Sequence, residues 1–183
     1  MLIDLADAAF DLDLQIAYAT ADNFAGRAIY ARPRALLRPE AAEKLAAACR
    51  LAGRLGLRFR IYDAFRPLEA QWALWRAAPN PGYVADPRRG GPHTRGIAVD
   101  LTLLGPEGAP LDMGGPFDEL TPNAWHEADV PEAAQRNRHL LLGLMTAAGW
   151  DCYLKEWWHY QLFEPRRYAV LSDAEVGAGM MPL

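Results

Sequence analysis

The chain has 183 residues, of which 51% are hydrophobic and 23% charged, a balance typical of one folded domain with a substantial core. With 19 basic and 23 acidic residues the net charge is -4, and Lys and Arg form no cluster, which excludes nucleic acid as the main partner. No apolar run approaches the roughly 18 residues that cross a bilayer, so the sequence predicts no membrane association.

The compartment is predicted from the N-terminus and the cysteines. Residues 1–5 show no basic segment followed by an apolar run, so they do not resemble a signal peptide. Cys49 and Cys152 are the only cysteines, and buried free thiols are favoured over a disulfide. Both observations predict a cytoplasmic protein.

The first regular elements follow from the spacing of apolar residues. Apolar positions at helical spacing predict a helix from residue 39 to about residue 54, where glycines end it. Strict alternation at 57–62 indicates a half-exposed strand. A second helix begins at residue 67 and carries Trp72 and Trp75 on its apolar side.

The rest of the chain alternates between loops rich in Pro and Gly and segments with an apolar periodicity. The tail, residues 173–183, carries little pattern and is expected to be frayed. The pattern predicts, in order, a loop at 78–92, a strand at 97–104, a loop at 105–129, a helix at 131–149, and strands at 150–153 and 157–163.

These elements together predict the fold class. Strands close enough to pair as hairpins, with helices between them, indicate an α+β fold. We expect a single domain over residues 1–183, with a mainly antiparallel sheet flanked by helices.

Two segments carry residues that suit a metal site. In the first, His93 lies in a Gly-rich loop and Asp100 lies in the strand that follows, on the face opposite its apolar residues. A carboxylate within an apolar strand needs a partner, because burying an unpaired charge is costly. The second segment, Glu-Trp-Trp-His, places Glu156 just ahead of a strand and His159 within it.

Two imidazoles and one carboxylate, from His93, Asp100 and His159, form a ligand set suited to Zn²⁺. Three protein ligands leave the fourth position for water, as in catalytic sites, and Glu156 would be near enough to take a proton from it. Taken singly, each residue is also compatible with a surface histidine or an ordinary salt bridge. The conjunction of the two segments favours the zinc site.

The order of these motifs resembles the zinc signature of the D-alanyl-D-alanine dipeptidases associated with vancomycin resistance. His-x6-Asp and the distant Glu-Trp-Trp-His are accompanied by Tyr-Ala-Thr-Ala-Asp-Asn-Phe at 18–24, Tyr-Asp-Ala-Phe-Arg-Pro at 62–67, and Met-Gly and Phe-Asp within 113–118. The segment at residues 18–24 is particular to the dipeptidase branch. The wider group of peptidoglycan DD- and LD-peptidases shares a Hedgehog-like fold, which the resemblance implies here.

The resemblance also implies a role for each matching residue. Arg66 would stabilise the oxyanion, which suits a guanidinium held between a strand and a helix start. Asp118 would anchor the ammonium group of the substrate, and Glu156 would be the general base. His126 and His139 match no ligand position. One zinc ion per chain would bind to His93, Asp100 and His159.

The reaction implied is hydrolysis of a small D-amino-acid dipeptide, D-Ala-D-Ala, by a metal-activated water. Two alternatives stay open: a D,D-carboxypeptidase acting on peptidoglycan stem peptides, and a non-catalytic zinc module that binds cell-wall fragments or a protein partner. Glu156 and Arg66 count against the module, because binding needs no proton shuttle. Gly91 and Pro92 depart from the family, which commonly has two serines before the first zinc histidine, and this leaves the substrate range open.

Overall fold

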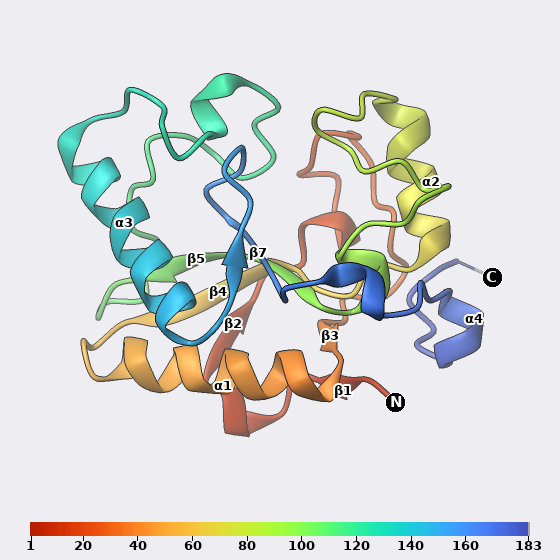
Figure 1. Cartoon of the computed structure of the whole chain (residues 1–183), viewed down its shortest axis with the longest axis horizontal. Helices are drawn as coiled ribbons and strands as arrows, with labels where there is room; N and C mark the ends of the chain where they lie inside the picture. Colours follow the sequence, from red (N-terminus) through yellow and green to blue (C-terminus); the bar gives the residue numbers. More distant parts are fainter. Residues whose placement is uncertain (183) are drawn as a thin grey trace.

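The computed structural model describes residues 1–182, which form an α+β fold around a five-stranded sheet (Figure 1). The strand order is β2-β4-β5-β7-β6, in which β2 and β4 are parallel and the other neighbours antiparallel. A small second sheet pairs β1 with β3. The strands are β1 (Ile3–Asp4), β2 (Leu12–Leu14), β3 (Leu36–Leu37), β4 (Arg58–Asp63), β5 (Ala98–Leu104), β6 (Asp151–Cys152) and β7 (His159–Gln161). The prediction of an α+β fold with a mainly antiparallel sheet is confirmed.

The three longer helices begin next to prolines, whose fixed φ suits the first turn of a helix. They lie within two residues of their predicted bounds. Helix α1 packs against β4 and α3 along one side of the sheet (Figure 1). The helices are α1 (Pro39–Gly53), α2 (Leu68–Ala77), α3 (Glu132–Ala147) and α4 (Asp173–Val176).

The sheet has an apolar face and a polar face, because side chains alternate along a strand. Phe59 and Ile61 of β4 lie beside Leu103 and Leu101 of β5, and all four are buried in the core that α1 and α3 complete. Asp100 projects to the other face of β5. The long loops at 78–92 and 105–129 cover this polar face and leave room for a site.

The second long loop is fixed to α3 by one buried arginine. Arg138 is 0% exposed, and its guanidinium donates hydrogen bonds to the carbonyls of Met113, Asn123 and Trp125. A loop without strands therefore has a defined path, and this path sets the position of Asp118.

The closing strands are shorter than predicted. Strand β6 covers only Asp151–Cys152 and β7 only His159–Gln161. The reason lies in the loop above them: the backbone N–H of Trp157 donates to the carbonyl of Ala124 instead of to a strand.

Helix α2 also turns a different side inward than predicted, since Gln71 and Leu74 are buried while the tryptophans of this helix are only half-buried.

Within the described residues, the tail for which the sequence predicts fraying contains a short helix. Helix α4 begins with a capping box, in which the side chains of Ser172 and Glu175 each accept a hydrogen bond from the other's backbone N–H. Met180 is fully buried, and its N–H donates to Asp173. The Ser-x-x-Glu spacing was the sequence signal for this ordered segment.

Cys49 and Cys152 are free and half-buried, so the thiols are less enclosed than predicted. None of the helices within residues 1–182 has the length and apolarity needed to cross a bilayer.

Candidate active site

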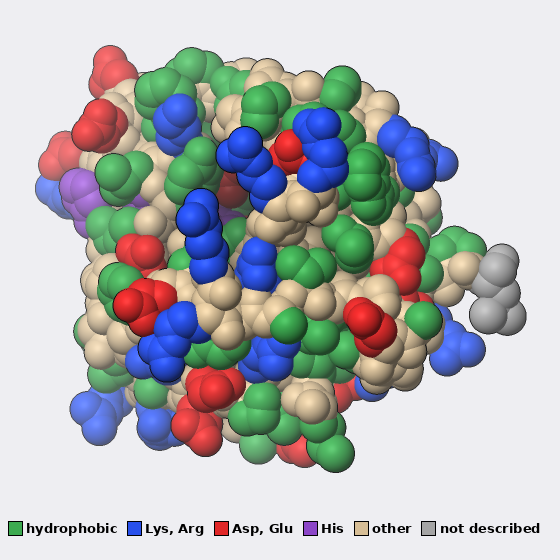
Figure 2. Space-filling model, turned by 45° about the vertical axis from the view of Figure 1, so that its right-hand side comes forward, with side chains coloured by type: hydrophobic (Ala, Val, Ile, Leu, Met, Phe, Trp, Pro, Cys, Tyr) green, Lys and Arg blue, Asp and Glu red, His purple; other side chains and the backbone are tan. Residues whose placement is uncertain are grey.

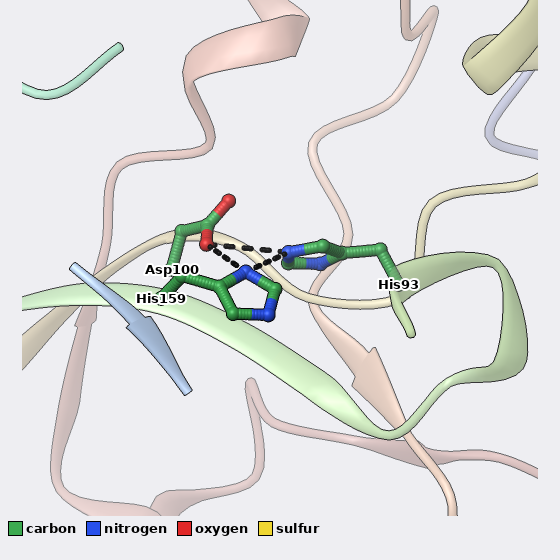
Figure 3. A group of neighbouring side chains, drawn as sticks. All are labelled: His93, Asp100 and His159. Atoms are coloured by element: carbon green, nitrogen blue, oxygen red, sulfur yellow. Dashed lines mark hydrogen bonds and ion pairs between the residues drawn. The ribbon is translucent and has the colours of Figure 1, made fainter. Parts of the chain in front are cut away.

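Three buried side chains converge on the polar face of the sheet. Asp100 of β5 and His159 of β7 are direct partners in the strand register, and both point to this face. His93 reaches them from a short 3₁₀ helix, η3 (His93–Arg95), that precedes β5. One ligand atom from each of the three lies within 4.8 Å of the others, and Figure 3 shows the side chains pointing at a common position.

The hydrogen bonds behind these residues fix which ring nitrogens face inward. Nδ1 of His93 lies 2.7 Å from the carbonyl oxygen of Ala64, and Nε2 of His159 lies 3.0 Å from the amide oxygen of Gln161. Both oxygens only accept, so the rings donate to them and keep lone pairs on Nε2 of His93 and Nδ1 of His159.

The inward atoms fit a cation. The two inward nitrogens lie 3.1 Å apart, and Oδ1 of Asp100 lies 3.2 Å from that of His93 and 3.1 Å from that of His159. Two lone pairs and a carboxylate oxygen repel one another unless a positive charge lies among them. This donor set suits Zn²⁺.

Glu156 lies next to the ligand set without belonging to it. Its Oε2 is 3.7 Å from Nδ1 of His159, and its side chain is 16% exposed. Burial raises the pKa of Glu156 to about 7, with a further increase from the charge of Asp100. A carboxyl with a pKa near neutrality suits a general base at physiological pH.

Arg66 is held rigidly on the other side of Asp100. Its Nε donates to Oδ2 of Asp63 at 2.8 Å, its Nη1 donates to Gln71 at 3.1 Å, and its Nη2 lies 3.6 Å from Oδ2 of Asp100. The guanidinium also stacks over the ring of Tyr18, 4.8 Å from its centroid. An arginine with so many contacts has one orientation, which is what stabilisation of a developing negative charge requires.

All these groups line one cavity of about 230 Å³, which is smaller than the pockets that hold drug-sized ligands. Asp118 lies in its wall, where Oδ1 accepts a hydrogen bond from the hydroxyl of Tyr18 at 3.0 Å. Its Oδ2 is buried and has no partner among the described residues. Burial raises the pKa of Asp118 to about 8, and the nearby charge of Asp100 adds to the effect. A cationic group in the cavity would satisfy this oxygen.

Gly91 and Pro92 also line the cavity. A Cβ added to Gly91 would lie 3.1 Å from the Cβ of Ala85, so a side chain at this position requires Ala85 to shift by a few tenths of an ångström. The departure from the family serines is thus accompanied by a closely packed wall.

On the face shown in Figure 2, Lys and Arg side chains gather around a hollow, so an anionic group that approaches this face meets a positive field.

The structure thus brings every residue proposed for the site to one cavity. Sequence reasoning missed Asp63, Gln71 and Gln161, which support the site through hydrogen bonds. Of these three, Gln161 could have been found from the sequence, because a residue two positions after His159 shares its face of the strand. His126 is buried beside α3 and lies outside the converging group of ligand atoms.

Comparison with known proteins agrees with the geometry. A family model described as D-ala-D-ala dipeptidase matches residues 1–172. A D-alanyl-D-alanine dipeptidase of Escherichia coli (strain K12) is 46% identical over 174 residues, covering 94% of this chain and 90% of the relative. Enzymes with the same name from Streptomyces coelicolor and Enterococcus faecium are 35% and 32% identical, covering 80% and 79% of this chain and 84% and 83% of their own lengths. The chain therefore belongs to the D-Ala-D-Ala dipeptidase family of peptidases.

Proposed function

We propose that this chain is a zinc-dependent peptidase that hydrolyses the D-Ala-D-Ala dipeptide, with one zinc ion bound by His93, Asp100 and His159. The convergence of these three buried ligand atoms, with Glu156 and Arg66 beside them, carries the proposal. The names of the relatives support the dipeptide as substrate. The small size of the cavity supports it too.

Zinc at this position would supply an acidified water and an electrophile for the scissile carbonyl. Glu156 takes a proton from the attacking water and delivers it to the amine that leaves when the C–N bond breaks. Arg66 stabilises the negative charge that develops on the carbonyl oxygen. Asp63 and Gln71 keep the guanidinium in place while this charge develops.

Asp118 binds the ammonium group of the dipeptide. Its Oδ2 is the buried acceptor without a partner, and the hydroxyl of Tyr18 fixes the other oxygen. A dipeptide offers few groups to hold, so its charged ends must set the register of the scissile bond. Asp118 fixes the position of the ammonium end.

A substrate panel tests the proposal. D-Ala-D-Ala, L-Ala-L-Ala and a peptidoglycan stem pentapeptide are incubated with zinc-loaded and with chelator-treated protein. We expect zinc-dependent cleavage of D-Ala-D-Ala, poorer cleavage of L-Ala-L-Ala, and an intact pentapeptide. Comparable cleavage of the pentapeptide would identify a D,D-carboxypeptidase, and a zinc-loaded protein inert on all three would identify a binding module.

A further inference from the structure

We propose that the side-chain amide of Gln161 binds the terminal carboxylate of the substrate, an assignment that rests on the proposed function. Gln161 lies in β7 two residues after His159, so both side chains project to the cavity face. Its amide oxygen accepts the hydrogen bond from His159. Among residues 1–182 its NH₂ group has no hydrogen-bond partner, and this leaves two donors for a ligand.

Gln161 and the ammonium site at Asp118 lie on opposite sides of Asp100 along the direction of β5. Phe117, the neighbour of Asp118, packs on Tyr62, which follows the strand partner of Leu101, and on Trp158, whose carbonyl accepts a hydrogen bond from Leu101. Gln161 is instead paired with Ala98. Asp100 lies between Ala98 and Leu101, so the ammonium site and the free amide flank the ligand set along the strand.

A dipeptide matches this arrangement. Its scissile carbonyl lies between an ammonium group at one end and a carboxylate at the other. With the ammonium at Asp118 and the carbonyl beside Arg66, the carboxylate extends toward the Ala98 end of β5. Gln161 offers a free amide donor at this end.

Positions 91 and 92 of the neighbouring loop provide no side-chain hydroxyl. The carbonyl of Pro92 accepts a hydrogen bond from Ile97, whose own carbonyl accepts one from Leu162, so residues 91 and 92 lie at the same end of the cavity. Glycine and proline have no side-chain donor there. Tyr153 also lines the cavity, with its ring centroid 6.1 Å from that of His159, and its hydroxyl is a competing donor close to the ligand set.

The variant Gln161→Glu separates the two roles of this side chain. Glutamate keeps an oxygen that can accept from His159, but it replaces the NH₂ donors with negative charge. We expect unchanged zinc content and a KM for D-Ala-D-Ala raised about 10- to 100-fold, the factor supplied by a hydrogen bond to a charged group. For the same dipeptide with a C-terminal carboxamide, KM should change by less than about threefold. Gln161→Met, which removes donors without adding charge, should show the same preference for the amide, more weakly.

Tyr153→Phe is the matched control and should leave the ratio of the two KM values as in the wild type. An equal loss on acid and amide, no loss on either, or loss of zinc from Gln161→Glu would overturn the assignment. So would a control variant that reproduces the acid-specific loss. A wild-type enzyme inert on D-Ala-D-Ala would defeat the proposed function itself, and the assignment with it, before any variant is compared.

Discussion

Nε2 of His93 lies 3.1 Å from Nδ1 of His159, and each ring has already committed its N–H to an oxygen on its far side. The close approach of two lone pairs is the feature that most directly calls for a cation. We predict one zinc ion per wild-type chain and a loss of most of it in His93→Ala and His159→Ala. Elemental analysis of dialysed protein measures this, with the exposed His139→Ala as the control. Near-stoichiometric zinc in either ligand variant would contradict the assignment.

Removal of the metal should also lower stability. A ligand that binds only the folded state stabilises it by about 4 kcal/mol when present at 1,000 times its Kd. We therefore expect a chelator to lower the midpoint of thermal unfolding in the wild type. His93→Ala should show almost no response to the chelator, because little metal is left to remove. An identical response in both proteins would mean that zinc binds elsewhere.

Glu156→Gln should keep the fold and the zinc but lose most turnover. The amide is similar in size to the carboxylate but cannot take a proton from water, and a general base contributes about 10²–10⁴-fold. The measurement pairs kcat with zinc content. The nearby Lys155→Gln, in which a charge is also lost from the same turn, is the control and should stay near wild-type turnover. A Glu156 variant that lost its metal would instead show that Glu156 is a ligand.

The ligand residues could be predicted from the sequence because each lies in a segment with its own signal. A polar residue in an apolar strand, as at Asp100, and a repeated pairing of histidine with carboxylate are visible without a structure. The supports of Arg66 were not visible. Gln71 joins Arg66 to the carbonyl of Ala85, and this link depends on how α2 packs against the 78–92 loop.

The fold was predictable to a similar extent. Helices α1 and α3 start at prolines and carry long apolar periodicities, so their bounds followed closely. Strands β1 and β3 have two residues each and exist because they pair with one another. A two-residue strand has no periodicity to recognise, and its partner is distant in the sequence.

Asp63 is predicted to be a positioning residue for Arg66. Its carboxylate accepts hydrogen bonds from Tyr30 and from Arg66, each at 2.8 Å. In Asp63→Asn the ion pair with Arg66 is lost, and an NH₂ group must face either Arg66 or the hydroxyl of Tyr30, so the guanidinium is held less firmly. We expect kcat to fall about 10- to 100-fold, in line with the cost of a small misplacement of a reacting group, with little change in KM.

The control for this variant is Asp13→Asn, which weakens a comparable aspartate–arginine pair with Arg60, away from the cavity. Zinc content is measured as well, because Oδ2 of Asp63 lies 3.7 Å from Nδ1 of His93. Full zinc with reduced kcat supports the positioning role. Unchanged kcat in Asp63→Asn would show that Arg66 is held without it.

Asp118 should make KM depend on pH. Burial raises its pKa to about 8, so in the free enzyme the carboxyl is largely protonated at pH 6 and ionises as the pH rises toward 8. Only the ionised form attracts the ammonium group, so KM should fall over this range and rise again above it, as the substrate amine loses its proton near pH 8. Asp118→Asn should have a higher KM without the fall between pH 6 and 8. A wild-type KM that is constant over this range would contradict the role.

The same shift has a consequence for stability. A carboxyl whose pKa is raised in the folded state favours folding when it is protonated. Its contribution is complete below the ordinary value of 3.8 and is lost as the pH rises toward 8. Metal-free Asp118→Asn should therefore lose less stability than the metal-free wild type between pH 5 and pH 8 in urea unfolding. Parallel pH profiles for the two proteins would show that the pKa of Asp118 is not raised in the folded state.

Arg138 is predicted to stabilise the loop that carries Asp118. It is 0% exposed and donates to three carbonyls of residues 113–125. In Arg138→Met the apolar chain can still fill the space, but the carbonyls lose their donors. Each buried acceptor left without a partner costs about 1–3 kcal/mol, and water can reach some of them, so we expect a loss of about 3 kcal/mol in the free energy of unfolding. KM should rise too, because Asp118 loses its fixed position.

The exposed Arg136→Met on the same helix is the control and should change stability by less than about 0.5 kcal/mol. If Arg138→Met proved as stable as this control, the path of the loop would have to be fixed by its other contacts.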